Sequence, residues 1–216
     1  MASLPARKRE TMSSIAYQRV KAKLLCGEYM PGQFLQVEEV SRDLELGRTP
    51  VHQALHLLGQ EGMVEIIPRK GILVRADSME DIRQAFEVRM LLEPHCAARC
   101  AEFATPELIS ALRESIEKQK ALGNEPHSDE LMPYDREMHS LITHNAHNKV
   151  IVDILQPIHE RMTRTWLMPH WRERDFLTTI AEHEALVECI ERGDADGAAA
   201  AMRAHLASVK GRMGLR

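Results

Sequence analysis

The sequence has few aromatic residues and few cysteines. Phe, Trp and Tyr make up 4% of the 216 residues, whereas there are 12 methionines, so we expect cores filled mainly by flexible aliphatic side chains. The four cysteines lack the C-x-x-C spacing of zinc and redox motifs and are too few for a disulfide framework. Reduced thiols, most of them buried, fit this pattern best, and they predict a cytoplasmic protein.

Long apolar segments are also missing. No run of about 18 apolar residues occurs, which excludes a transmembrane helix. The first residues, MASLPARKRETMSS, are basic but contain no apolar stretch typical of a secretory signal. We interpret residues 1–11 as a flexible tail.

Charge is present in both signs but is unevenly distributed. Residues 1–75 carry 11 Lys and Arg against 8 Asp and Glu, whereas the remainder carries 17 against 24. The net charge of −4 therefore combines a mildly basic first segment with an acidic body. This distribution is compatible with nucleic-acid binding at one end of the chain only.

Residues 12–76 contain helix signals followed by strand signals. Apolar residues recur at helical spacing from Met12 to about Gly27, and further helices are predicted over 37–44 and 50–60, the last with Thr49 as N-cap. Two β-rich runs, 63–67 and 71–74, flank a basic turn and predict a two-stranded hairpin. This order is typical of a winged helix-turn-helix DNA-binding domain.

From about Ser78 onward every periodic stretch is helical. Helices are predicted over 79–103, 106–122, 128–147, 149–168, 172–192 and 195–211. Residues 77–216 should therefore form an all-α bundle of six helices, and the fold class is mainly α.

Four polar residues lie where the helical period places apolar ones: Asp135, His139, His183 and His205. Buried polar groups need partners, and a divalent metal would satisfy all four together. For each histidine taken alone, a hydrogen-bonded core histidine is the favoured alternative. Three other histidines contrast with these, since His144 and His147 fall off the inward stripe of their helix and His159 lies at the rim of its own.

Arg89 and Glu93 are also predicted to face inward. Two interpretations remain open: an ion pair between residues four apart, or an Arg89 side chain that binds the carboxylate of a ligand. Arg161 and Arg164 are weaker candidates for the same role.

The stretch from Leu24 to Val74 closely resembles the DNA-binding domain of the GntR family. The resemblance rests on Gly27-Glu28, Pro31-Gly32, Arg48 to Val51, Glu61 to Val64 and Arg69 to Gly71. It implies DNA contacts from Arg48, Thr49, His52, Arg69, Lys70 and Gly71. The family usually has Arg-Glu where this chain has His52-Gln53, so the operator sequence does not follow from the resemblance.

Residues 79–210 resemble the FCD ligand-binding domain of the FadR-type branch of GntR regulators, and the short six-helix form resembles the VanR-like subgroup. Many such domains bind a divalent metal such as Zn, Ni or Mn through one Asp and three His, which match the four inward residues named above. The resemblance implies a homodimeric regulator, more often a repressor than an activator, that binds double-stranded operator DNA and senses a small carboxylate without catalysis.

Two alternatives remain open on the sequence. The first is a metal-dependent hydrolase built on the same Asp and His residues. The second is a helical dimer in which these residues form only a hydrogen-bonded network.

Overall fold

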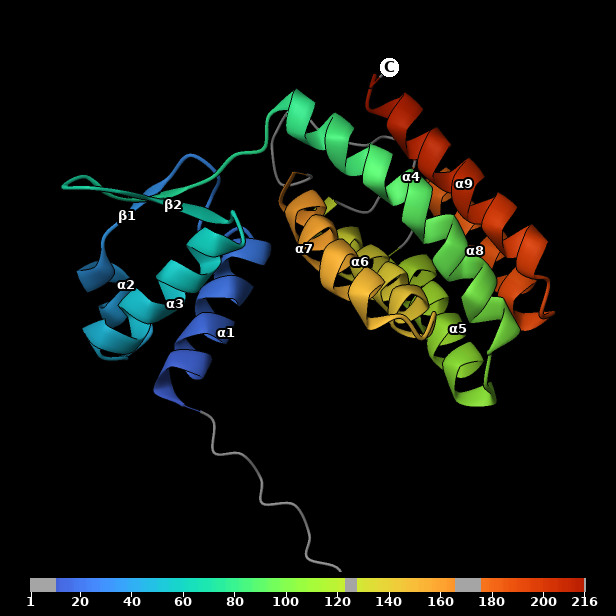
Figure 1. Cartoon of the computed structure of the whole chain (residues 1–216), viewed down its shortest axis with the longest axis horizontal. Coiled ribbons are helices and arrows are strands. Elements are labelled where there is room, and N and C mark those ends of the chain that lie inside the picture. Colours follow the sequence, from blue (N-terminus) through green and yellow to red (C-terminus); the bar gives the residue numbers. More distant parts are fainter. Residues whose placement is uncertain (1–10, 123–127, 166–175, 216) are drawn as a thin grey trace, which may run out of the picture. The chain divides into compact units, whose positions relative to one another are not determined.

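The chain divides into two compact units, Met1–Ala76 and Asp77–Arg216. The structure, a computed structural model, describes residues 11–122, 128–165 and 176–215 (Figure 1). All but the last residue of the expected tail, 1–11, lies outside the described residues. None of the described helices is long and apolar enough to cross a membrane.

The first unit contains three helices, α1 (Met12–Leu25), α2 (Val37–Asp43) and α3 (Arg48–Gln60). α1 and α3 pack against each other through fully buried apolar side chains, Val20 and Leu24 from α1 and Val51 and Leu58 from α3. The prediction that Thr49 is the N-cap of α3 is wrong. The extended residue is Gly47 and the helix begins at Arg48, so Thr49 already lies inside the first turn.

A small antiparallel sheet completes the first unit. Its strands are β1 (Phe34–Leu35), β2 (Val64–Ile67) and β3 (Gly71–Val74), in the order β1-β3-β2. The expected hairpin is β2-β3, and the sequence prediction missed β1. A strand of two residues is too short to show alternation, and its partner lies almost forty residues further along the chain.

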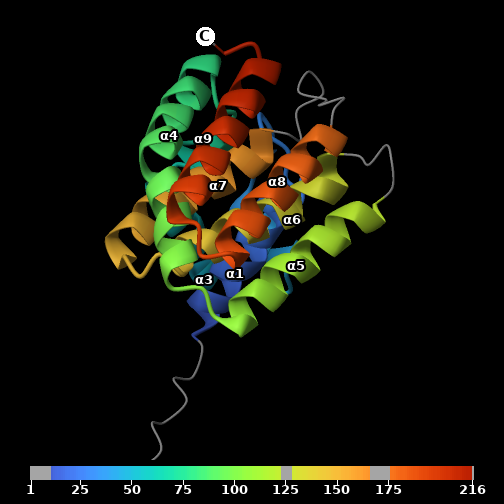
Figure 2. The ribbon, with the colours of Figure 1, turned by 90° about the vertical axis from the view of Figure 1, so that its right-hand side faces the viewer.

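The second unit is formed by α4 (Met79–Glu102), α5 (Pro106–Ala121), α6 (Ser128–His144), α7 (Lys149–Thr165), α8 (Phe176–Glu191) and α9 (Ala195–Arg212). Its described residues contain six helices and no strand, which confirms the expected all-α class. α4 and α9 run side by side along one face of the bundle (Figure 2).

Local signals explain where several of these helices begin. Ser78 and Asp81 form a reciprocal capping box at the start of α4, and the Thr105 hydroxyl accepts a hydrogen bond from the Leu108 N–H at the start of α5. The Asp194 carboxylate caps α9 in the same way. The segment 166–175 between α7 and α8 lies outside the described residues.

All six helices contribute to one apolar cluster in the second unit. Several polar side chains are buried at its centre: Arg89, Glu93, Gln119, His139, His159, His183 and His205. Burial of so many polar groups is costly unless each has a partner. The buried polar residues at the centre of the bundle are therefore the candidate functional site.

Candidate metal centre and DNA interface

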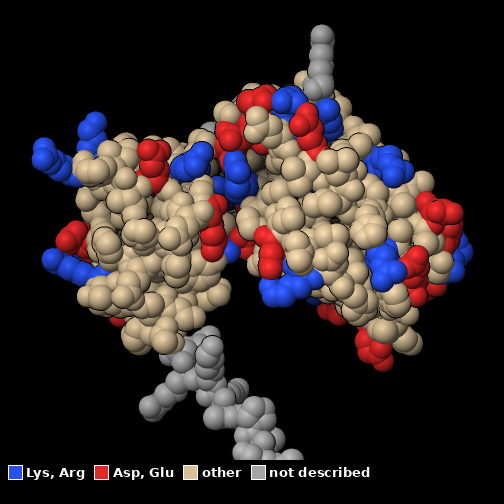
Figure 3. Space-filling model, in the orientation of Figure 1, with Lys and Arg blue, Asp and Glu red and all other residues tan. Residues whose placement is uncertain are grey.

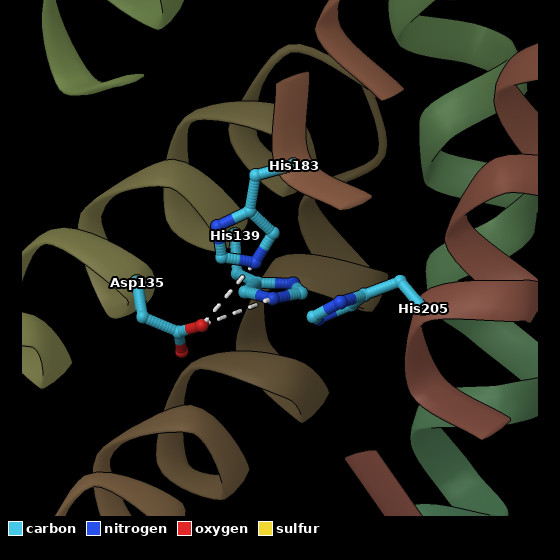
Figure 4. Close-up of side chains that lie close together, drawn as sticks. All are labelled: Asp135, His139, His183 and His205. Carbon is cyan, nitrogen blue, oxygen red and sulfur yellow. Dashed lines mark ion pairs between the residues drawn. The ribbon is translucent and has the colours of Figure 1, made fainter. Parts of the chain in front are cut away.

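The four inward residues predicted from the sequence lie together in the second unit. Asp135 and His139 come from α6, His183 from α8 and His205 from α9, and their side chains point toward one another (Figure 4). One potential ligand atom from each lies within 4.8 Å of those of the other three. The Oδ1 atom of Asp135 is 3.4 Å from Nε2 of His183 and 3.8 Å from Nε2 of His139.

The outer nitrogen of each imidazole has a hydrogen-bond acceptor. The Nδ1 atoms of His139, His183 and His205 lie 2.7, 2.8 and 2.9 Å from oxygens of Glu93, Gln119 and Glu182, respectively. Carboxylate and amide oxygens only accept hydrogen bonds, so each Nδ1 carries the proton. Each Nε2 therefore presents a lone pair, which is how metal-binding histidines are oriented by their outer partners.

Two of these lone pairs accept no hydrogen bond from the described residues. Nε2 of His139 and Nε2 of His183 are buried, and within the described part of the chain neither has a hydrogen-bond partner. A buried nitrogen without a partner costs roughly 1–3 kcal/mol, so the arrangement needs a group that accepts these lone pairs.

Burial also keeps two of the imidazoles neutral, those of His183 and His205. It lowers the pKa of His183 well below the usual value and lowers the pKa of His205 as well. Burial raises the pKa of Glu182, but hydrogen bonds from His205, Ser208 and Arg212 outweigh it and lower the pKa to about 2. Neutral imidazoles and an ionised outer carboxylate are the protonation states that metal binding requires.

These residues fit a divalent transition metal. Three imidazole nitrogens and one carboxylate oxygen are the donor set that zinc and its neighbours prefer, and carboxylate-paired histidines are typical of such sites. The two buried Nε2 atoms without partners give the same indication from this chain's own geometry.

Glu93 joins the candidate metal centre to two further donors, Arg89 and His159. Its Oε1 lies 2.5 Å from Nε of Arg89 and 2.9 Å from Nε2 of His159, while its Oε2 faces His139. Burial raises the pKa of Glu93, but the positive charge of Arg89 outweighs it and, with the neighbouring His139 and His159, holds the pKa well below the usual range. Of the two interpretations of Arg89, the ion pair is therefore the one observed.

His159 was expected at the rim of its helix, and this expectation is wrong. Its side chain is buried, because α7 packs against both α6 and α4. His144 and His147 are exposed, as expected. The sequence prediction also missed Gln119, since a glutamine on an amphipathic helix gives no metal-site signal.

The residues expected to contact DNA lie on one surface of the first unit. Arg48, Thr49 and His52 come from the start of α3, and with Gly71 of β3 they line a groove of about 480 Å³. Arg69 and Lys70 are exposed in the turn between β2 and β3. Figure 3 shows basic side chains at this end of the sheet.

Two further residues of this surface, Gln36 and Glu38, were not predicted from the sequence. Gln36 donates a hydrogen bond from Nε2 to the backbone oxygen of Lys70 at 3.0 Å and so joins the start of α2 to the hairpin turn. Glu38 lies 3.2 Å from the exposed guanidinium of Arg48. Exposed pairs of this kind contribute little to stability, and a phosphate could replace the carboxylate.

Two family models match successive parts of the chain. Residues 13–74 match the family model described as bacterial regulatory proteins, gntR family, and residues 84–208 match the FCD domain. The structure of E. coli McbR/YncC aligns with a TM-score of 0.81 at 19% identity, covering 92% of this chain and 95% of that one.

Two further relatives are informative. The HTH-type transcriptional repressor RspR of Escherichia coli (strain K12) is 24% identical over 179 residues, which are 83% of this chain and 78% of that protein. The metal-free FCD domain of TM0439 is 25% identical with a TM-score of 0.50, covering 63% of this chain and 94% of that one.

Proposed function

Because the chain belongs to the GntR family of bacterial regulatory proteins and carries an FCD domain, we propose that it is a metal-containing repressor that releases operator DNA when a small organic acid binds. Its role as a DNA-binding transcriptional regulator of the FadR-type branch follows from the family. The repressor role, the acid and the metal are our proposal, as is membership of the VanR-like subgroup. A hydrolase is not proposed, because the relatives are named as regulators.

One observation carries the metal proposal: three buried imidazoles present Nε2 toward one another and Asp135, each held from outside by an acceptor. Asp135, His139, His183 and His205 would hold a divalent ion such as Zn, Ni or Mn. When bound, the ion supplies a positive charge that attracts a carboxylate oxygen of the effector.

In the first unit, Arg48, Thr49 and His52 would enter the major groove at the N-terminal end of α3. A planar guanidinium at Arg48 suits a guanine edge or a phosphate. Arg69, Lys70 and Gly71 would follow the backbone at the adjacent groove, where a residue without a side chain permits close approach. We propose a homodimer on a near-palindromic operator in the cytoplasm.

A route for communication is available at the start of the second unit. The Asp77 carboxylate accepts a hydrogen bond from Nε of Arg161 at 2.8 Å and lies 3.6 Å from Nη2 of Arg164. Both arginines are on α7, which also carries His159 beside the proposed metal site. Asp77 follows β3 by only three residues. A shift of α7 would therefore displace Asp77 and the segment that leads to the DNA-binding unit.

The proposal is tested in two steps. Protein purified without chelator should contain close to one equivalent of metal, and His183→Ala and Asp135→Ala variants should lose it while staying folded. Gel-shift titration with the gene's own promoter region should give a sequence-specific complex that an organic acid weakens. By linkage, an acid that weakens DNA binding must bind more weakly to the DNA complex than to free protein.

The controls separate the two halves of the proposal. His144→Ala removes an exposed histidine of α6 and should leave the metal content unchanged. Arg48→Gln should abolish the specific DNA complex without affecting the metal. The absence of any specific complex at moderate salt would contradict the regulator function, whereas metal-free protein with normal DNA binding would contradict only the metal centre.

A further inference from the structure

The outward face of α3 offers neutral hydrogen-bonding side chains. Apart from Arg48 at its start, the helix contains no Lys, Arg, Asp or Glu. Beyond the first turn, contacts from this face to base edges must therefore be hydrogen bonds between neutral groups. Five polar residues of the helix are exposed: Thr49, His52, Gln53, His56 and Gln60. Of these, Gln53 lines the same groove as Thr49 and His52.

The side chain of Gln53 is held by α1. The hydroxyl of Ser13, the second residue of α1, donates a hydrogen bond to Oε1 of Gln53. Within residues 11–122, 128–165 and 176–215, the Gln53 side chain forms no other hydrogen bond. The contact turns the oxygen of the amide toward α1. The NH2 group of Gln53, with its two donor hydrogens, is therefore turned away from α1 and is available to a ligand in the groove.

The position of Ser13 is fixed by the packing of α1 against α3. Ala16 and Val20, which follow Ser13 on the same side of α1, are fully buried. The Tyr17 hydroxyl donates a hydrogen bond to Glu61 at 2.6 Å, immediately after the end of α3. Apolar contacts and this second hydrogen bond hold the two helices in register. The contact between Ser13 and Gln53 therefore does not depend on these two side chains alone.

The free NH2 group determines which base edge Gln53 can recognise. In the major groove, guanine presents two adjacent acceptors, O6 and N7, whereas adenine presents the N7 acceptor beside the N6 donor. An unrestrained glutamine suits adenine, because its amide offers a donor and an acceptor side by side. With Oε1 held by Ser13, Gln53 offers the groove only donors, and these match guanine.

We propose that Gln53 is a further base-reading residue of this protein, and that Ser13 is a positioning residue that changes its preference from adenine to guanine. The inference rests on the DNA-binding function of the first unit and is independent of the metal and the effector. A phosphate oxygen is also an acceptor, but a contact to it would carry no sequence information, so the two sources are separated by experiment.

The test measures a base preference with the full chain. Selection from a library of randomised DNA duplexes gives the preferred sequence. Fluorescence anisotropy with duplexes that carry each of the four base pairs at every position of one half-site then gives relative affinities. We expect a position at which guanine is preferred to adenine by about 3- to 10-fold, the value of one hydrogen bond between neutral groups.

Three variants assign this preference to residues. Gln53→Ala should abolish it and leave the preferences at other positions unchanged. Gln53→Glu has the same shape but only accepts, so it should prefer cytosine, whose N4 is a donor. Ser13→Ala frees Oε1 and should prefer adenine by a similar factor. Ser14→Ala and Gln60→Ala are matched controls, since they change the next residue of α1 and the last residue of α3, and both should keep the guanine preference.

A Gln53→Ala variant that binds every duplex more weakly by the same factor would show a phosphate contact and would overturn the inference. An unchanged guanine preference in Gln53→Ala or in Ser13→Ala would overturn it as well. Melting curves on the same preparations show that each variant is folded. If the unaltered protein selects a sequence and the variants do not differ from it, the inference fails alone. If no sequence is selected, the DNA-binding function fails with it.

Discussion

The amide oxygen of Gln119 lies 2.8 Å from Nδ1 of His183, and both side chains are fully buried. The two residues come from α5 and α8, so the contact depends on how these helices pack. Because the amide oxygen only accepts, it fixes the proton on Nδ1 and turns the lone pair of Nε2 toward Asp135. The neutral Gln119 thus orients His183, as Glu93 orients His139 and Glu182 orients His205.

Gln119→Met should weaken zinc binding by about 10- to 100-fold, the usual cost of losing an outer partner of a metal-binding histidine. Methionine has nearly the same length and keeps the core filled, so the thermal stability of the metal-free protein should change little. Competition with a chromophoric chelator measures the affinity. Gln156→Met, an exposed position on α7, is the control. Equal zinc affinity in both variants would contradict an orienting role for Gln119.

The metal-free protein should lose stability as the pH falls from 7.5 to 5.5. Burial lowers the pKa values of His159, His183 and His205 below the usual 6.5, so below that pH the unfolded chain takes up protons that the folded chain resists. Each suppressed histidine lowers the free energy of unfolding by at most about 1.4 kcal/mol per pH unit. Urea denaturation at several pH values measures this.

Glu93 and Glu182 act in the same direction at lower pH, because their lowered pKa values make the folded chain resist protonation there too. His159→Phe removes one of the suppressed imidazoles and should show a shallower loss of stability. A free energy of unfolding that stays level or rises between pH 7.5 and 5.5 would contradict the prediction.

Asp77→Asn should uncouple the two units. It removes the charge that faces Arg161 and Arg164, while the proposed metal ligands and the DNA-binding residues stay in place. We expect operator affinity in the absence of acid to change by less than about threefold, and the effect of a bound acid on that affinity to shrink by about fivefold or more. Gel shifts with and without acid measure both. Asp153→Asn, an exposed ion-pair residue on α7, should retain full coupling.

Gly71→Ala should distort the β2-β3 hairpin. Gly71 has a φ of +113°, and an added Cβ would lie 2.8 Å from the backbone oxygen of Leu35 and 2.7 Å from Nε2 of Gln36. We expect a loss of roughly 1–3 kcal/mol in stability, with weaker operator binding. Gly211→Ala is the matched control, because its Cβ would meet nothing within 4 Å and alanine favours a helix. Melting curves for both variants measure the change in stability, and equal melting temperatures would contradict the prediction.

The sequence by itself determined the helices, the β2-β3 hairpin and the inward direction of the polar side chains. Helical periodicity placed Asp135, His139, His183 and His205 on inward faces, and caps such as Thr105 marked helix starts, because both signals depend on neighbours within a few residues. The same local signals located the β2-β3 hairpin and its basic turn. The family motifs in residues 24–74 depend on sequence alone.

Only the tertiary structure decided which inward residues meet. His183 is hydrogen-bonded to Gln119, and His159 to Glu93, across more than sixty residues of chain. β1 pairs with β3 across almost forty residues. The same packing buried His159 and paired Arg89 with Glu93. Periodicity fixes the direction of a side chain relative to its own helix axis, but the neighbour it reaches depends on how the helices pack against one another.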